Sequence, residues 1–134
     1  TDYAVEIYYE AVKGNKFTCN IAPDVYMDMM YMPDALRATV ELMEADPSKL
    51  KHRNSFNIAS MSFTPEIIRE VVERHVPGFQ MDYNVDPVKD VISRSWPNSL
   101  DDTWAREEWG WKPEWDLESM TKDMLEKVRI KLGL

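Results

Sequence analysis

The sequence of 134 residues is short of glycine, cysteine and histidine, and each shortage excludes a class of site. Its four glycines stand far apart, so the chain cannot build a glycine-rich phosphate loop of the dinucleotide or Walker type. Cys19 is the single cysteine, which rules out a disulfide framework and a thiolate metal site and favours a reducing, cytoplasmic compartment. His52 and His75 lack the spacing of metal ligands, and we interpret both as surface residues. No Gly-x-Ser-x-Gly phrase is present, and the residues alone reveal no catalytic machinery.

Positive charge and long apolar runs are also scarce. Lysine and arginine number 16 against 24 acidic residues, for a net charge of −8, and the basic residues are scattered. This balance disfavours nucleic acid and anionic membranes as partners. No apolar run approaches the roughly 20 residues needed to cross a bilayer. The composition, 44% hydrophobic and 30% charged, is ordinary for one globular domain or one half of a larger one.

Hydrophobic periodicity predicts strands that alternate with helices, which indicates the α/β class. Extended segments are expected at 17–21, 24–32, 55–59 and 79–83, and helices at 3–12, 34–43, 65–75, 86–92 and 117–132. We expect 29–32 and 55–59 to belong to one larger sheet whose other strands this chain does not supply, leaving an unpaired edge. Asp102 is interpreted as the cap of a further helix. The methionine-rich patch at 27–32 is either adaptable core filler or a ligand surface.

All five tryptophans fall between Trp96 and Trp115, among the turn residues Pro97, Gly110 and Pro113. Large aromatic rings on irregular backbone give rigid walls, which often line sites for small molecules. The alternative is that the rings tie a short lobe together. We interpret Trp104 and Trp115 as packing residues.

Several phrases of the sequence, in order and across nearly the whole chain, resemble the C-terminal portion of extended short-chain dehydrogenase/reductases. The resemblance implies an α/β fold that is the C-terminal part of such an enzyme, with a Rossmann-type sheet remnant and a small substrate-binding lobe. The phrases are Tyr-Met-Pro-Asp-Ala-Leu-Arg-Ala at 31–38, Phe-Asn-Ile-Ala at 56–59, Phe-Thr-Pro-Glu at 63–66, and Asp-Asp-Thr with Trp-Gly-Trp-Lys-Pro at 101–113.

Four further phrases, partly overlapping these, resemble the epimerase-like L-threonine 3-dehydrogenases more narrowly: 1–8, 29–35, 61–65 and Ser-Trp-Pro at 95–97. These enzymes oxidise L-threonine with NAD to 2-amino-3-oxobutanoate. Their glycine-rich loop, catalytic Ser/Thr and Tyr-x-x-x-Lys pair precede the position of Thr1. The resemblance therefore implies that residues 1–134 are the substrate-binding half, that the dinucleotide-binding N-terminal half is absent, and that this chain holds no catalytic, cofactor-binding or metal residue. We expect a fragment that is inactive alone, and a homodimer of the complete enzyme.

The resemblance assigns two substrate-binding residues, Thr1 and Trp96. Thr1 matches the end of the family's Gly-Gly-Thr-Thr loop, where a hydroxyl can bind the carboxylate or ammonium group of threonine; it can equally cap the first helix. Trp96 matches the tryptophan that closes over the amino acid, with core packing as the alternative. Asp28 departs from the family, which usually has proline at that position.

Two other functions remain open from the sequence. A nucleotide-sugar epimerase or dehydratase of the same superfamily would need a basic residue for a diphosphate, and 29–32 offers none. A stand-alone, non-catalytic binding module is the second alternative.

Overall fold

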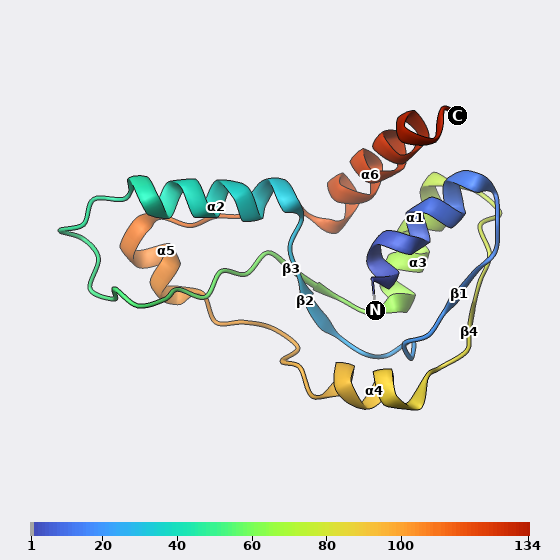
Figure 1. Ribbon diagram of the computed structural model, residues 1–134, viewed down its shortest axis with the longest axis horizontal. Helices are drawn as coiled ribbons and strands as arrows, with labels where there is room; N and C mark the ends of the chain where they lie inside the picture. Colours follow the sequence, from blue (N-terminus) through green and yellow to red (C-terminus); the bar gives the residue numbers. More distant parts are fainter. Residues whose placement is uncertain (1) are drawn as a thin grey trace.

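The computed structural model describes residues 2–134, and Thr1 lies outside the described residues. Its fold is α/β, and the elements alternate along the chain as the periodicity predicts (Figure 1). The helices are α1 (Tyr3–Lys13), α2 (Met32–Glu44), α3 (Pro65–His75), α4 (Pro87–Arg94), α5 (Thr103–Trp109) and α6 (Leu117–Leu132). The strands are β1 (Phe17–Cys19), β2 (Met27–Met29), β3 (Met61–Phe63) and β4 (Met81–Tyr83).

The strands form two small sheets of two strands each. β1 and β4 are parallel, with Phe17 opposite Met81, whereas β2 and β3 are antiparallel. Figure 1 shows β1, β4, α1, α3 and α6 at one end of the molecule, and α2 and α5 at the other. The β2–β3 pair lies between the two ends and joins them.

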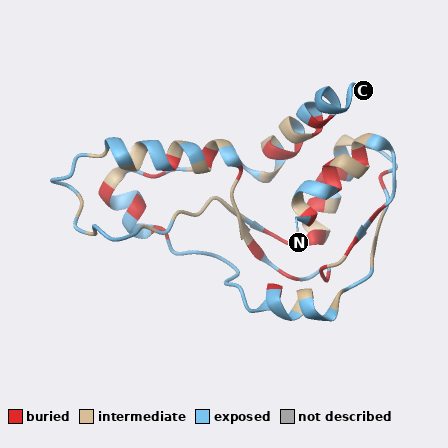
Figure 2. Cartoon of the chain, in the orientation of Figure 1, coloured by how far each residue is buried: buried red, intermediate tan, exposed pale blue. Residues whose placement is uncertain are grey.

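The main core lies where α1, α3 and α6 pack together. Ile7 and Tyr8 of α1 meet Ile68 and Val72 of α3, and all four are completely buried. The Tyr8 hydroxyl is hydrogen-bonded to the Thr121 hydroxyl of α6 (2.9 Å), so the one polar tip in this contact has a buried partner. Figure 2 shows this burial as red along the facing sides of the helices, with pale outer sides.

A second, smaller core lies at the other end, between α2 and α5. Ala38 and Ala105 are small enough to let the two helices approach, and the ring of Trp111 fills the space beside them. Phe56 and Trp109 cover this cluster from its rim. The tryptophan-rich segment thus holds a lobe together, as one reading of its aromatic residues predicts.

The predicted starts of α3 and α4 are confirmed in detail. Thr64 accepts a hydrogen bond from the Ile67 backbone (3.2 Å) at the start of α3, and Asp86 does the same for Val88 (2.9 Å) at the start of α4. In both helices a proline occupies the first turn, where its missing N–H costs nothing.

One strand prediction is wrong and a second is right only in part. The segment 55–59 forms no strand, because the described chain offers it no neighbouring strand; the Ala59 N–H donates instead to the Asp102 carboxylate (3.3 Å). Of the extended segment expected at 24–32, only β2 is a strand. It ends at Met29, and α2 begins at Met32 because Pro33 favours a helical first turn. The other strands of the expected larger sheet were assigned to sequence outside this chain, so that sheet stays a prediction.

The capping prediction for α5 is also corrected. Asp102 occupies the N-cap position, but its side chain makes no capping bond. It accepts hydrogen bonds from Ala59 and from the Arg106 guanidinium (2.7 Å). The preceding residue, Asp101, takes the bond from the Thr103 backbone (3.0 Å).

Candidate functional site

Trp96 lies immediately beyond α4, in the connection to α5. Its backbone N–H donates to the Ser93 carbonyl (3.2 Å), which extends the last turn of the helix. The side chain is 52% exposed. Among the aromatic pairs of residues 2–134, none includes the Trp96 ring. Trp96 is therefore not a core residue of this chain, and its ring is free to contact another molecule or another part of a longer protein.

The helix that presents Trp96 is fixed by ion pairs. Arg94, in the last turn of α4, contacts Asp90 one turn earlier (2.9 Å) and Asp24 before β2 (2.9 Å). These hydrogen bonds hold the pKa of the Asp24 carboxyl below its usual value. A cationic residue in the last turn also suits the helix dipole. The backbone before Trp96 is thus held in place although the ring itself is open.

Thr1, the other predicted substrate residue, lies outside the described residues, so its role stays a prediction. The neighbouring Asp2 occupies the N-cap position of α1 but makes no side-chain capping bond. Its carbonyl accepts from the backbone N–H groups of Val5 (2.8 Å) and Glu6 (2.9 Å).

The other tryptophans have partners. Trp111 is 2% exposed, and its indole N–H donates to the Ala59 carbonyl (2.9 Å). Trp115 packs edge-on against Tyr31, with the ring centroids 5.0 Å apart. Trp104 stacks on the ring of His52 at 3.6 Å, but it remains 56% exposed, so the packing interpretation fits Trp104 less well than Trp115.

Sequence reasoning missed a buried carboxylate at the start of α2. Asp34 is completely buried. Its oxygens accept hydrogen bonds from the Arg37 guanidinium (2.9 Å) and from the backbone N–H groups of Glu114 and Trp115 (3.1 Å each). These bonds attach the segment that follows Trp111 to the first turn of α2, where a negative charge also suits the helix dipole. Its position after Pro33, at a helix start, was the only signal in the sequence.

A second missed carboxylate joins α5 to the loop after α2. Glu108 is largely buried and accepts from the backbone N–H groups of Lys51 (2.8 Å) and His52 (3.0 Å); its other oxygen contacts the His52 ring. Burial alone would raise the pKa of Glu108, but these hydrogen bonds outweigh it and lower the pKa below its usual value. Both Asp34 and Glu108 stabilise the lobe. Trp96 is not among the hydrogen-bond partners of either carboxylate.

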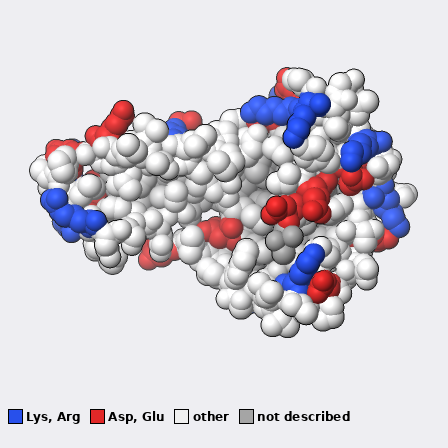
Figure 3. Space-filling view, in the orientation of Figure 1, with Lys and Arg blue, Asp and Glu red and all other residues white. Residues whose placement is uncertain are grey.

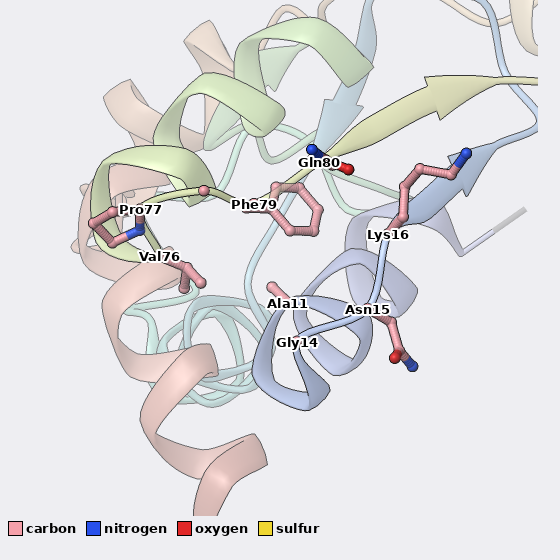
Figure 4. A pocket seen from close by; sticks show the side chains of 9 residues that line it. Ala11, Gly14, Asn15, Lys16, Val76, Pro77, Phe79 and Gln80 are labelled. Carbon is pink, nitrogen blue, oxygen red and sulfur yellow. The ribbon is translucent and has the colours of Figure 1, made fainter.

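A cavity of about 240 Å³ lies elsewhere, between the turn after α1 and the turn after α3 (Figure 4). The ring of Phe79 and the side chain of Ala11 lie close together in it. Its one charged lining residue, Lys16, forms an ion pair with Asp82 (2.5 Å). Trp96 is not part of the lining, and we assign no substrate to this cavity.

The described residues do not fit a dinucleotide. A pyrophosphate binds where a glycine-rich loop meets a helix N-terminus. Here Gly14, Gly110 and Gly133 occupy the opposite ends of helices, as left-handed C-terminal caps of α1, α5 and α6. Residues 2–134 also contain no group of three or more His, Cys, Asp or Glu side chains that could hold a metal ion. Within the same range no helix has the length and apolar character needed to span a membrane.

Comparison with known proteins first shows the class of protein that shares this fold. No family model matches the chain. The UDP-glucose 4-epimerase of Thermotoga maritima superposes with a TM-score of 0.79 over 98% of this chain and 40% of its own, at 24% identity, which shows the shared fold. The fold is that of the C-terminal portion of an extended, GalE-like short-chain dehydrogenase, as the resemblance implied.

Within that class the chain is similar to L-threonine dehydrogenases. The enzyme of Clostridium difficile is 54% identical, with a TM-score of 0.94 over 97% of this chain and 41% of its own. The GalE-like L-threonine dehydrogenase of Cupriavidus necator is 50% identical, with a TM-score of 0.91 over 95% and 41%. An uncharacterized epimerase/dehydratase of Staphylococcus haemolyticus is 52% identical over 98% of this chain. The chain spans about 41% of that relative's length.

Proposed function

We propose that this chain is the substrate-binding part of an NAD-dependent L-threonine 3-dehydrogenase, which converts L-threonine to 2-amino-3-oxobutanoate. The observation that carries the proposal is the contrast in identity at similar coverage: 54% to an L-threonine dehydrogenase against 24% to a UDP-glucose epimerase. Since the chain spans about 41% of those enzymes, we assign the dinucleotide-binding half to sequence outside these 134 residues.

In this proposal, the chain binds and encloses threonine and leaves the redox step to the other half. The exposed ring of Trp96 forms one wall of the threonine site and excludes water from it. The Thr1 hydroxyl, which can donate and accept, binds the carboxylate or ammonium group. In the complete enzyme the other half would hold NAD, which would supply the hydride acceptor; the glycines of this chain give no reason to place any of the cofactor site here.

A nucleotide-sugar epimerase or dehydratase is the second candidate, because the similar Staphylococcus haemolyticus protein is named an epimerase/dehydratase. A sugar nucleotide brings a diphosphate, which proteins bind with arginine, lysine or helix N-termini. Residues 27–32, which include the strand β2, carry no basic side chain, and Asp28 adds a negative one. The charge at this position therefore favours threonine.

The test uses the complete reading frame that contains this chain. Purified enzyme should reduce NAD in the presence of L-threonine, measured by NADH absorbance, and should not interconvert UDP-glucose and UDP-galactose. Sugar-nucleotide activity without threonine activity would reject the proposal in favour of the second candidate. A reading frame that starts at Thr1, with no Tyr-x-x-x-Lys phrase upstream, would favour a stand-alone binding module.

A further inference from the structure

The connection that carries Trp96 runs from α4 to α5 and is held at its middle by the β2–β3 pair. The Ser62 hydroxyl of β3 donates a hydrogen bond to the backbone carbonyl of Asn98, 36 residues later in the chain. This bond joins β3 to a loop that lies far from it in the sequence. It fixes the backbone two residues after Trp96.

Asp28 of β2 stands directly opposite Ser62 in the antiparallel register. Partial burial raises the pKa of the Asp28 carboxyl, the backbone N–H of Leu100 opposes this rise, and the charge of Asp102 at the start of α5 adds to it. Asp28 thus lies near the same loop, but the Ser62 hydroxyl makes the hydrogen bond that attaches the loop to the strand pair.

The two ends of the loop are held separately. Before Trp96, Arg94 is paired with Asp24 and Asp90. After Leu100, the Asp102 carboxylate accepts from the backbone of Ala59. The interval between these attachments contains the turn residues Pro97 and Asn98, and the Ser62 hydroxyl donates a hydrogen bond within it.

We propose that Ser62 is a positioning residue that holds the Trp96 loop against the β2–β3 pair and so fixes where the Trp96 ring meets the substrate. This inference rests on the proposed function for its substrate, but the loop contact itself does not.

The first test is kinetic, on the complete enzyme. Ser62→Ala should raise the KM for L-threonine about three- to tenfold, the usual effect of losing one hydrogen bond, with the KM for NAD unchanged. Ser62→Thr keeps a hydroxyl and should stay near wild type. Ser60→Ala is the matched control, since the Ser60 hydroxyl donates to the Trp115 carbonyl (3.2 Å) and not to the Trp96 loop.

The second test separates this proposal from the proposed function. Hydrogen exchange of the loop amides at 98–101 should accelerate at least threefold in Ser62→Ala and stay unchanged in Ser60→Ala. If the wild-type enzyme does not use threonine, the proposed function fails, yet exchange still decides whether the loop is anchored. Unchanged exchange in Ser62→Ala would overturn the inference. So would faster exchange with an unaltered KM for threonine in an active enzyme.

Discussion

Trp96 differs from the other tryptophans at the level of the single residue. Trp111 and Trp115 lie against neighbouring groups of the chain, and Trp104 stacks on His52. The Trp96 ring has no aromatic partner among residues 2–134 and is about half exposed. A large aromatic side chain gains most when it is buried, so an open one on a fixed backbone is available for contact with a ligand or another part of the protein.

Trp96→Ala in the complete enzyme tests this interpretation. We expect kcat/KM for L-threonine to fall roughly ten- to a hundredfold, because one aromatic wall is worth on the order of 1–3 kcal/mol. NAD binding should be unaffected, since the cofactor is assigned to the other half. Trp115→Ala is the control: its ring packs on Tyr31, so this change should lower the melting temperature. If Trp96→Ala lowers stability and spares kcat/KM, the assignment of Trp96 to the substrate is wrong.

The buried carboxylate Asp34 shows what the sequence could not reveal at this scale. Its backbone donors lie 80 and 81 residues away, at Glu114 and Trp115. Local patterns identify an acidic residue at a helix start, but they carry no information on a partner so distant. The role of Trp96, by contrast, could be suggested from a short phrase, because a resemblance depends on residue order and not on contacts.

At the scale of elements, the Glu108 carboxylate attaches α5 to the loop at 51–52, and the strength of this contact depends on pH. The pKa of Glu108 is lowered in the folded state by hydrogen bonds from Lys51 and His52. A carboxyl with a depressed pKa contributes stability that is complete above its unfolded value, about 4.3, and is lost as the pH falls through the folded value.

Glu108→Gln should therefore remove part of the acid sensitivity of the lobe. We expect the wild-type protein to lose stability as the pH drops below about 4, and the variant, less stable at pH 7, to lose less over the same range. Urea denaturation at a series of pH values measures both. The adjacent Glu107→Gln is the control, because Glu107 is exposed on the same helix. Equal pH slopes for wild type and Glu108→Gln would show that the contact does not control acid stability.

Helices and strands differ in how far the sequence predicts them. The starts of α3 and α4 could be predicted from Thr64-Pro65 and Asp86-Pro87, since a cap and a first-turn proline act within four residues. The segment 55–59 has a strand-like sequence but forms none, because a strand needs a partner. The N–H and the carbonyl of Ala59 in this segment are hydrogen-bonded instead to the side chains of Asp102 and Trp111.

At the scale of the molecule, one face of α2 is apolar and uncovered. Its residues recur at helical spacing along a single side and are 52–80% exposed: Met32, Leu36, Val40 and Met43. Figure 3 shows a largely uncharged surface over this helix. Such a stripe is expected on a helix that packs against another layer. Together with the unpaired segment 55–59, it is a surface that the described chain does not cover.

The 134-residue chain alone should therefore associate. We expect analytical ultracentrifugation to show oligomers or aggregates at micromolar concentration, and Leu36→Lys to reduce them by placing a charge in the stripe. Ile130→Lys is the matched control, because Ile130 is 72% exposed on α6, a different helix. A monodisperse wild-type monomer that melts cooperatively would contradict the expectation, and so would equal effects of the two lysine variants.

The last prediction concerns which half of the complete enzyme binds NAD. Cofactor binding needs backbone N–H groups presented by a glycine-rich loop at a helix N-terminus, and the glycines in α1, α5 and α6 are at the helix C-termini, where carbonyl groups point outward. This end of a helix repels a pyrophosphate because the dipole there is negative. Calorimetric titration of the isolated chain with NAD should therefore give no heat of binding, while the complete enzyme should bind NAD. A micromolar affinity of the isolated chain would place a cofactor site within these residues and overturn the assignment of NAD to the other half.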